Sequence, residues 1–298
     1  TKAATACYYI KGLCASTERN FEETYINFMK VMTIMENNPL IMSELPKRYV
    51  KAVNNVIFYY MNRKDWDNCF KMIQKMNGLV NKKGFESLDV QLKLFTFPKN
   101  AELLVCMAKG DFDEAIDTVV PLILKGIKTY DGKINNEEVM LFYYNICITH
   151  FGVGDYKKAL KYINLVLNNS ETGLREDVYT FARLVNLIIH FELGNFELLE
   201  YTLKSTKRFL KTRNKLFDYE YIILKFVQKI TSHNFDKYEK DDELEKLINS
   251  LNEISQNPLE NIPIEYFDCK LWAESKLQKK KLSDLIKESN RPLLNFKF

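Results

Sequence analysis

The stretch His150-Phe151-Gly152-Val153-Gly154-Asp155-Tyr156 returns forty residues later as His190-Phe191-Glu192-Leu193-Gly194-Asn195-Phe196. Each copy joins two apolar segments of helical spacing through a tight turn. The glycine is typical of a helix end, where the backbone often needs a left-handed conformation. The Asn or Asp that follows is typical of an N-cap, because its side chain accepts hydrogen bonds from exposed backbone N–H groups. Each stretch therefore predicts a helical hairpin.

The same signature, a small or polar residue, then Asn or Asp, then an aromatic residue, occurs six times in all. The capping positions are Asn20, Asp65, Asp111, Asp155, Asn195 and Asn234, at spacings of 45, 46, 44, 40 and 39 residues. Self-similarity with a period of roughly 20–50 residues indicates a repeat architecture. We predict an all-α, right-handed α-solenoid of about six helix-turn-helix repeats.

The repeats are predicted to cover residues 1–256, with two helices in each. The first helices are expected at 2–17, 46–62, 99–108, 137–152, 177–192 and 217–231. The second helices are expected at 20–35, 65–77, 111–125, 155–169, 195–211 and 235–255. Pro98 disfavours helix at the residue before it, so a break or kink is expected after the apolar segment 88–97.

Residues 257–298 are predicted to form a C-terminal cap of the same solenoid domain, because the last repeat of a solenoid needs its apolar face covered. A helix is expected to begin at Pro263, a favoured first helical residue. Its buried side is predicted to carry Ile264, Phe267, Leu271, Trp272 and Ser275. The basic run 279–281 suits the helix end, and a short helix follows near 282–289. No polar cap is evident at the N-terminal end, so a longer parent protein stays an open alternative.

The turns resemble the tetratricopeptide repeat. In the fourth repeat Gly154, Asp155, Tyr156, Ala159 and Leu160 match the family's GDYxxAL core, and the third repeat follows with Gly110, Asp111, Phe112, Ala115 and Ile116. Repeats of that family are about 34 residues long, and all of these are longer. The resemblance implies a superhelix whose first helices line a concave groove that binds a protein or peptide segment.

An apolar and aromatic row would face this groove if the family register holds. The candidate groove residues are Phe58, Met61, Met107, Tyr144, Ile148, Phe151, Leu184, Ile188 and Phe191. Apolar anchors at helical spacing suit a partner segment laid into a groove. The alternative is that these residues are interior packing, because aromatic residues at helical spacing usually belong to a core.

A basic stretch at 204–215 is the second candidate surface. Lys204, Lys207, Arg208 and Lys211 are predicted to share one face of a helix, and no acidic residue occurs from Tyr201 to Phe217. Such a face could contact an acidic partner or nucleic-acid phosphate. A merely solvated face is the alternative. The net charge of +4 is too small to indicate nucleic-acid binding by itself, so nucleic acid is the less favoured partner.

Catalytic and metal-binding motifs are missing from the sequence. No GxxxxGK[ST], GxGxxG or GxSxG occurs. His150 and His190 share one repeat position but lack further ligands at metal-binding spacing, so they are expected to fill helix ends. No CxxC pair occurs among Cys7, Cys14, Cys69, Cys106, Cys147 and Cys269, which predicts free thiols in a reducing cytoplasm.

Together these patterns predict a cytoplasmic, non-enzymatic protein- or peptide-binding scaffold without cofactor, metal or membrane span. Two alternatives stay open. The chain could be the sensor or interaction region of a longer regulatory protein, or it could bind nucleic acid or an acidic partner through residues 204–215.

Overall fold

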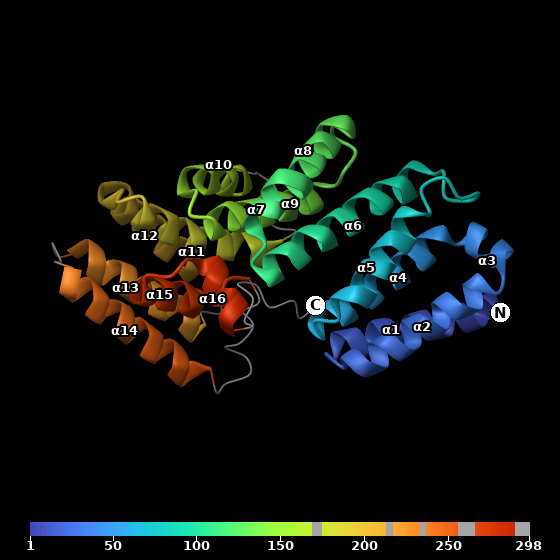
Figure 1. The fold of residues 1–298 in the computed structure, drawn as a ribbon, viewed down its shortest axis with the longest axis horizontal. Coiled ribbons are helices and arrows are strands. Elements are labelled where there is room, and N and C mark those ends of the chain that lie inside the picture. Colours follow the sequence, from blue (N-terminus) through green and yellow to red (C-terminus); the bar gives the residue numbers. More distant parts are fainter. Residues whose placement is uncertain (169–174, 213–216, 233–236, 256–265, 290–298) are drawn as a thin grey trace. The chain divides into compact units, whose positions relative to one another are not determined.

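A computed structural model describes residues 1–168, 175–212, 217–232, 237–255 and 266–289 (Figure 1). The described residues form an all-α fold with no strand among them. They divide into two compact units, residues 1–105 with 122–134, and residues 106–121 with 135–289. Handedness and repeat number of a solenoid remain predictions, whereas the all-helical class is confirmed.

The first unit begins with two hairpins. Helix α1 (Lys2–Thr17) packs on α2 (Phe21–Glu36), α2 packs on α4 (Pro46–Asn62), and α4 packs on α5 (Trp66–Asn77). A short helix, α3 (Pro39–Glu44), lies in the connection between the hairpins and was not predicted. Pro39 and Pro46 each start a helix, where the missing backbone N–H costs no internal hydrogen bond.

Helix α6 (Leu88–Lys109) runs without interruption through Pro98, so of the predicted break or kink at this residue the break is wrong. Proline removes one backbone hydrogen bond and disfavours helix in the residue before it. Here Leu94, Ala101 and Leu104 are buried on either side of Pro98. We infer that this packing holds the helix together across the proline. Tertiary burial outweighs the local preference.

The third predicted second helix is longer and less regular than expected. It consists of α7 (Phe112–Glu114), a π-helical turn (Ala115–Val119) and α8 (Val120–Thr129). Pro121 is the second residue of α8, two residues after the π-helical turn, and has no N–H with which to continue α-helical bonding there. A π-bulge is one of the few ways in which a helix accommodates such a gap.

The second unit contains the remaining hairpins. Its helices are α9 (Asn136–Gly152), α10 (Tyr156–Leu167), α11 (Glu176–Glu192), α12 (Phe196–Lys211), α13 (Asp218–Ser232) and α14 (Lys237–Ile254). Each packs on the next along the chain (Figure 1), as the hairpin prediction requires. Two shorter helices follow, α15 (Cys269–Gln278) and α16 (Leu282–Ser289).

Every described copy of the turn has the same backbone geometry. The residue before the cap is left-handed, with φ of 58° at Arg19, 56° at Lys64, 74° at Gly110, 81° at Gly154 and 69° at Gly194. The next residue is the N-cap of the second helix at Asn20, Asp65, Asp111, Asp155 and Asn195, which confirms five predicted turns. The sixth, at Asn234, lies outside the described residues.

The C-terminal cap differs from the prediction at its start. Residues 256–265, including Pro263 and Ile264, lie outside the described part of the chain, and α15 begins only at Cys269. Asp268 is its N-cap and accepts a hydrogen bond from the Leu271 N–H at 2.9 Å. The predicted buried side is confirmed for Phe267, Leu271, Trp272 and Ser275. An acidic cap therefore starts this helix.

The left-handed turn residue gives a direct stability prediction. A Cβ at Gly154 would meet no atom within 4 Å, so Gly154→Ala tests the backbone conformation alone. We expect a loss of about 1–2 kcal/mol in the free energy of unfolding, measured by urea denaturation. Gly78→Ala is the matched control, because Gly78 has φ of −68° and an alanine fits there. Equal effects of the two variants would contradict the assigned role of the turn.

Candidate partner-binding surfaces

The predicted groove residues are mostly buried. Seven of the nine, Met61, Met107, Tyr144, Ile148, Phe151, Leu184 and Ile188, are no more than 2% exposed. Phe58 and Phe191 are half-buried. Five of the buried seven have non-aromatic apolar side chains and pack in the interior: Met61, Met107, Ile148, Leu184 and Ile188. The seven buried residues therefore belong to the interior packing of their own units, whereas Phe58 and Phe191 stay partly exposed.

In the second unit, part of this row faces residues 266–289, which we name the C-terminal arm. The Tyr144 hydroxyl donates to the carbonyl of Tyr266 at 3.0 Å, and the Tyr219 hydroxyl donates to the carbonyl of Phe267 at 2.5 Å. The ring of Phe267 packs edge-on against Phe151, with centroids 5.3 Å apart. We call the face of α9, α11 and α13 that carries Tyr144, Phe191 and Tyr219 the inner face.

Tyr266 is held at three points. Its ring stacks on Phe181 at 4.3 Å, its carbonyl accepts from Tyr144, and its hydroxyl donates to Asp177 at 2.5 Å. Arg175 also binds Asp177 through two hydrogen bonds of 3.0 and 2.9 Å. Burial opposes ionisation of Asp177, but these hydrogen bonds outweigh it and hold the pKa of the carboxyl below its usual value.

Trp272 anchors helix α15 to the same face. Its ring lies edge-on to Phe191 and Phe226, with centroids 5.7 and 6.1 Å away. The indole Nε1–H donates to Glu192 at 2.6 Å, and Lys276 forms an ion pair with the same carboxylate at 2.7 Å. Aromatic packing and the ion pair with Glu192 therefore position helix α15 together.

Helix α16 contacts the turn at Gly110. A Cβ on Gly110 would lie 2.9 Å from the carbonyl of Ser283, so the approach requires glycine. Asp111 forms ion pairs with Lys109 at 3.1 Å and Lys287 at 2.9 Å instead of capping its own helix through the side chain. The arm thus reaches from the inner face to the third predicted turn.

A cleft of about 790 Å³ lies between these turns and the arm. Lys279 and Lys281 line it on one side, and Asp113 and Glu114 on the other. Because both signs of charge line the cleft, its electrostatics favour neither an anion nor a cation.

The basic residues of α12 do not all share one surface. Lys204, Arg208 and Lys211 are exposed on the outer face, opposite the buried Leu203. Lys207 instead points to α13 and donates to Gln228 at 2.5 Å. Burial and then the nearby Lys211 lower the pKa of Lys207. Lys207 is thus the least exposed of the four predicted patch residues.

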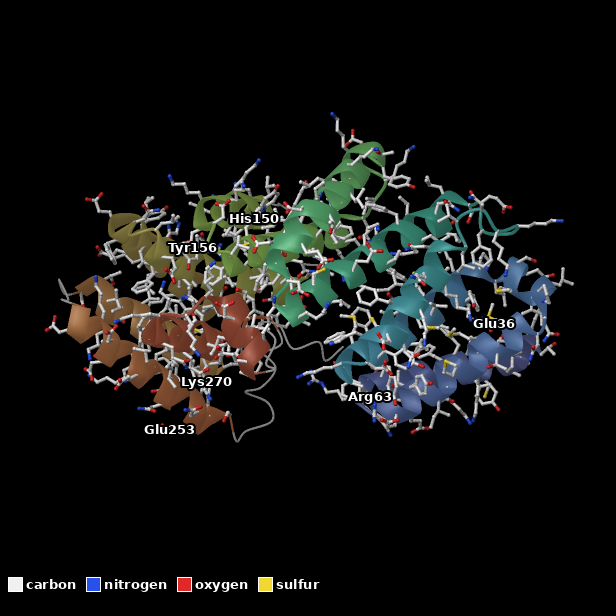
Figure 2. The ribbon with its side chains drawn as sticks, viewed as in Figure 1. Glu36, Arg63, His150, Tyr156, Glu253 and Lys270 are labelled. Atoms are coloured by element: carbon white, nitrogen blue, oxygen red, sulfur yellow. The ribbon has the colours of Figure 1, made fainter. Side chains whose placement is uncertain are left out.

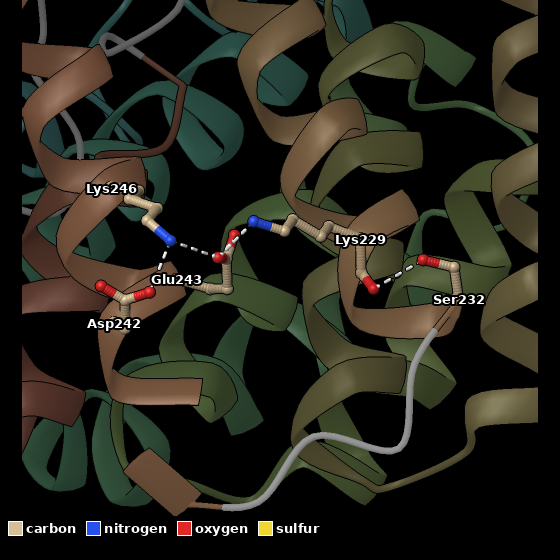
Figure 3. Close-up of polar contacts among 5 residues, drawn as sticks. All are labelled: Lys229, Ser232, Asp242, Glu243 and Lys246. Atoms are coloured by element: carbon tan, nitrogen blue, oxygen red, sulfur yellow. Dashed lines mark hydrogen bonds and ion pairs between the residues drawn. The ribbon is translucent and has the colours of Figure 1, made fainter. Parts of the chain in front are cut away.

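Glu243 joins α13 to α14 (Figure 3). Its carboxylate, 7% exposed, pairs with Lys229 at 2.5 Å and Lys246 at 2.9 Å, and Lys246 also pairs with Asp242. Burial opposes ionisation of Glu243, but the two lysine bonds outweigh it and lower the pKa of the carboxyl. This arrangement satisfies a buried charge and serves packing of the last hairpin.

His150, labelled in Figure 2, lies in the last turn of α9, and His190 lies in the last turn of α11. His150 is buried and stacks on Tyr162 at 5.5 Å, and His190 lies 3.4 Å from the side-chain nitrogen of Asn195. Burial lowers the pKa of both imidazoles. Within the described residues, no group of three or more His, Cys, Asp or Glu is placed to hold a metal ion. All six cysteines are free thiols.

Comparison with known proteins gives no match to a protein-family model, a curated protein or a solved structure. The tetratricopeptide resemblance therefore stays a prediction that rests on the residues of the turns. Among the described helices, none has the length and apolar character needed to span a bilayer.

The polar groups that hold the arm escaped sequence analysis. Asp177 and Glu192 resemble ordinary charged residues at the two ends of a helix, and Tyr219 and Tyr266 belong to no repeated pattern. The one available signal was the density of aromatic residues around Phe267 and Trp272, which predicted a buried cap without indicating its partners.

Removing one hydroxyl should weaken arm docking. Tyr144→Phe leaves the Tyr266 carbonyl buried without its donor, and we expect a loss of about 1–3 kcal/mol in the free energy of unfolding. The neighbouring Tyr143→Phe is the matched control, because Tyr143 is half-buried against the ring of Tyr162. A change below about 0.5 kcal/mol is expected there by urea denaturation. Similar losses for the two variants would rule out a specific role for the Tyr144 hydroxyl.

The lowered pKa of Asp177 predicts that the stability of the fold depends on pH. A carboxyl whose pKa is lowered by folding stabilises the native state above its unfolded pKa, and this stability is lost as pH falls through the folded pKa. Asp177→Asn should therefore be less stable than wild type at pH 7, and the difference should shrink as pH falls below about 4. Urea denaturation across that range measures it. A difference that is independent of pH would show that ionisation of Asp177 does not contribute.

Proposed function

We propose that this chain is a non-enzymatic scaffold that binds an acidic protein segment on the outer face of α12. The observation that supports it is a row of exposed apolar and basic side chains along one helix. Tyr201 is 74% exposed and Leu198 55%, and the side chain of Lys204 is 72% exposed. Exposed large apolar residues grouped with cations are typical of an interaction surface.

Helical spacing places these residues together. Tyr201, Lys204, Arg208 and Lys211 follow each other at intervals of three or four, so they lie on one face of α12. The opposite face buries Leu199, Leu203, Thr206 and Leu210. Because the helix is fixed by that buried side, the outer row is a rigid surface with an apolar end and a basic end.

The chemistry of the row favours protein over nucleic acid. Glu200 forms an ion pair with Lys204 at 2.7 Å, so a carboxylate of the partner competes with Glu200 for this lysine, whereas Arg208 has no acidic residue one helical turn away. Leu198 and Tyr201 offer apolar contact area that suits a side chain of a protein partner. A matching segment places an apolar residue on Tyr201 and carboxylates on Lys204 and Arg208, where guanidinium and carboxylate can form two parallel hydrogen bonds.

The inner face is occupied and is therefore not the surface proposed for this partner. Tyr144, Phe151 and Tyr219 already contact the arm. A partner on α12 leaves these contacts intact, because the outer row lies opposite the buried side of its helix.

Charge reversal tests the proposal. The probe is a fluorescein-labelled peptide with one leucine followed by a run of glutamates, and fluorescence anisotropy gives its dissociation constant. Lys204→Glu combined with Arg208→Glu should weaken binding at least about tenfold, because like charges then face each other. The matched control is Lys157→Glu with Lys161→Glu, which reverses two exposed lysines on α10 and should change affinity little. Binding should also fall with salt.

A second probe separates the classes of partner. This probe is a labelled single-stranded RNA. If the RNA binds more tightly than the peptide, with a steep salt dependence, and the α12 variant abolishes that binding, nucleic-acid binding replaces the proposal. Equal effects of the α10 and α12 variants, or no binding of the peptide by the wild type, would overturn it.

A further inference from the structure

The C-terminal arm occupies the inner face as a ligand occupies a groove. The carbonyls of Tyr266 and Phe267 do not enter helical bonding and are bound instead by the side-chain hydroxyls of Tyr144 and Tyr219. The Tyr219 hydroxyl also accepts from the backbone N–H of Cys269 at 3.2 Å. Side chains of the hairpins thus form hydrogen bonds directly with the backbone of the arm.

Charge reinforces this recognition. Glu192, whose side chain is 6% exposed, receives hydrogen bonds from both Trp272 and Lys276 of the arm. Tyr156 also bonds to this carboxylate, but it is neutral, so the ion pair that balances the charge comes from the arm. At the far end, Lys287 pairs with Asp111. The fit is selective, because another segment that covered Glu192 without supplying a cation would leave a nearly buried charge unpaired.

The arm keeps its own local structure. Asp268 caps α15 through the Leu271 N–H, and the Ser275 hydroxyl donates to the Trp272 carbonyl at 2.7 Å. The Lys280 N–H bonds to the Ser275 carbonyl at 3.1 Å and closes the end of α15. These bonds lie inside the arm, so the same bonds are made when the arm docks on the inner face of another copy.

An unrelated ligand would have to replace a large apolar contact. Phe267, Leu271 and Trp272 are 2%, 0% and 1% exposed, and any substitute must fill the same volumes to regain their burial. The arm of a second copy of this chain has the same atoms and regains every contact. Exchange between identical copies therefore costs no packing at the site.

We propose that the inner face also binds the arm of a second copy, so that two chains exchange arms reciprocally and form a closed dimer. Such exchange of identical elements is a low-cost route to dimers. Eleven residues, 255–265, separate the arm from α14 in the sequence. Monomer and dimer contain the same contacts at the site, so concentration shifts the balance towards the dimer. This inference does not depend on the α12 surface.

A charge-swapped pair tests the exchange. Glu192→Lys alone sets two lysines against each other, and Lys276→Glu alone sets two glutamates against each other. In a mixture, arm exchange pairs the lysine introduced at position 192 of one chain with the glutamate introduced at position 276 of the other, while the second site regains its natural pair. We expect at least about tenfold more dimer in the equimolar mixture than in either variant alone. Native mass spectrometry measures it after warming, since the arm must first open.

The double variant Glu192→Lys with Lys276→Glu is the control, because each chain then satisfies its own pair and should dimerise no more than wild type. A mixture that stays monomeric would overturn the proposal. If a single variant fails to fold by itself, isotope-labelled and unlabelled wild type are warmed together at high concentration. Dimers of mixed mass support exchange, and monomers alone contradict it.

Discussion

A left-handed residue followed by an Asn or Asp cap sets the geometry on which each described hairpin depends. Glycine adopts that conformation at no steric cost, yet Arg19 and Lys64 adopt it as well, with φ of 58° and 56°. The conformation costs a non-glycine residue about 1–2 kcal/mol. Packing of α2 on α1 and of α5 on α4 outweighs that cost. The turn is thus maintained by the helices that it joins, even where its best residue is missing.

Fixed turns have a consequence for the second unit. They place α9, α11 and α13 so that Tyr144, Phe191 and Tyr219 share one face, and such an apolar face is unfavourable in water. The arm covers it with Phe267 and Trp272. Hydroxyls on the inner face are suited to this cover, since each donates to a backbone carbonyl that precedes helix α15. A repeat register that lines up apolar residues on one face therefore also predicts a segment that covers this face.

Sequence alone was sufficient for features encoded within a few residues, such as five turns and the buried residues Phe267, Leu271 and Trp272 of the C-terminal arm. Features decided by distant residues were missed. Pro98 looked like a helix end because its neighbours across the fold were unknown, and the bond from Tyr144 to the Tyr266 carbonyl joins positions 122 residues apart. Hydrophobic periodicity likewise does not reveal whether a row of apolar side chains faces solvent or packs against another segment of the chain. Lys207 belongs to a basic stretch and yet turns to Gln228, because each position rotates a side chain by about 100° around a helix.

The inner face differs from the outer face of α12 in the interactions that select what binds there. On the inner face, deep burial of Phe267 and Trp272 gives strong binding only to a segment of matching shape, and Glu192 adds a requirement for charge. On α12, Tyr201 and Lys204 remain largely in water, where screened charges and limited apolar area give weaker and salt-dependent contacts. A partner held by α12 can therefore associate and dissociate while the arm stays bound. If the proposed function holds, one helical framework combines a persistent contact with its own sequence and a surface for a reversible contact with another protein.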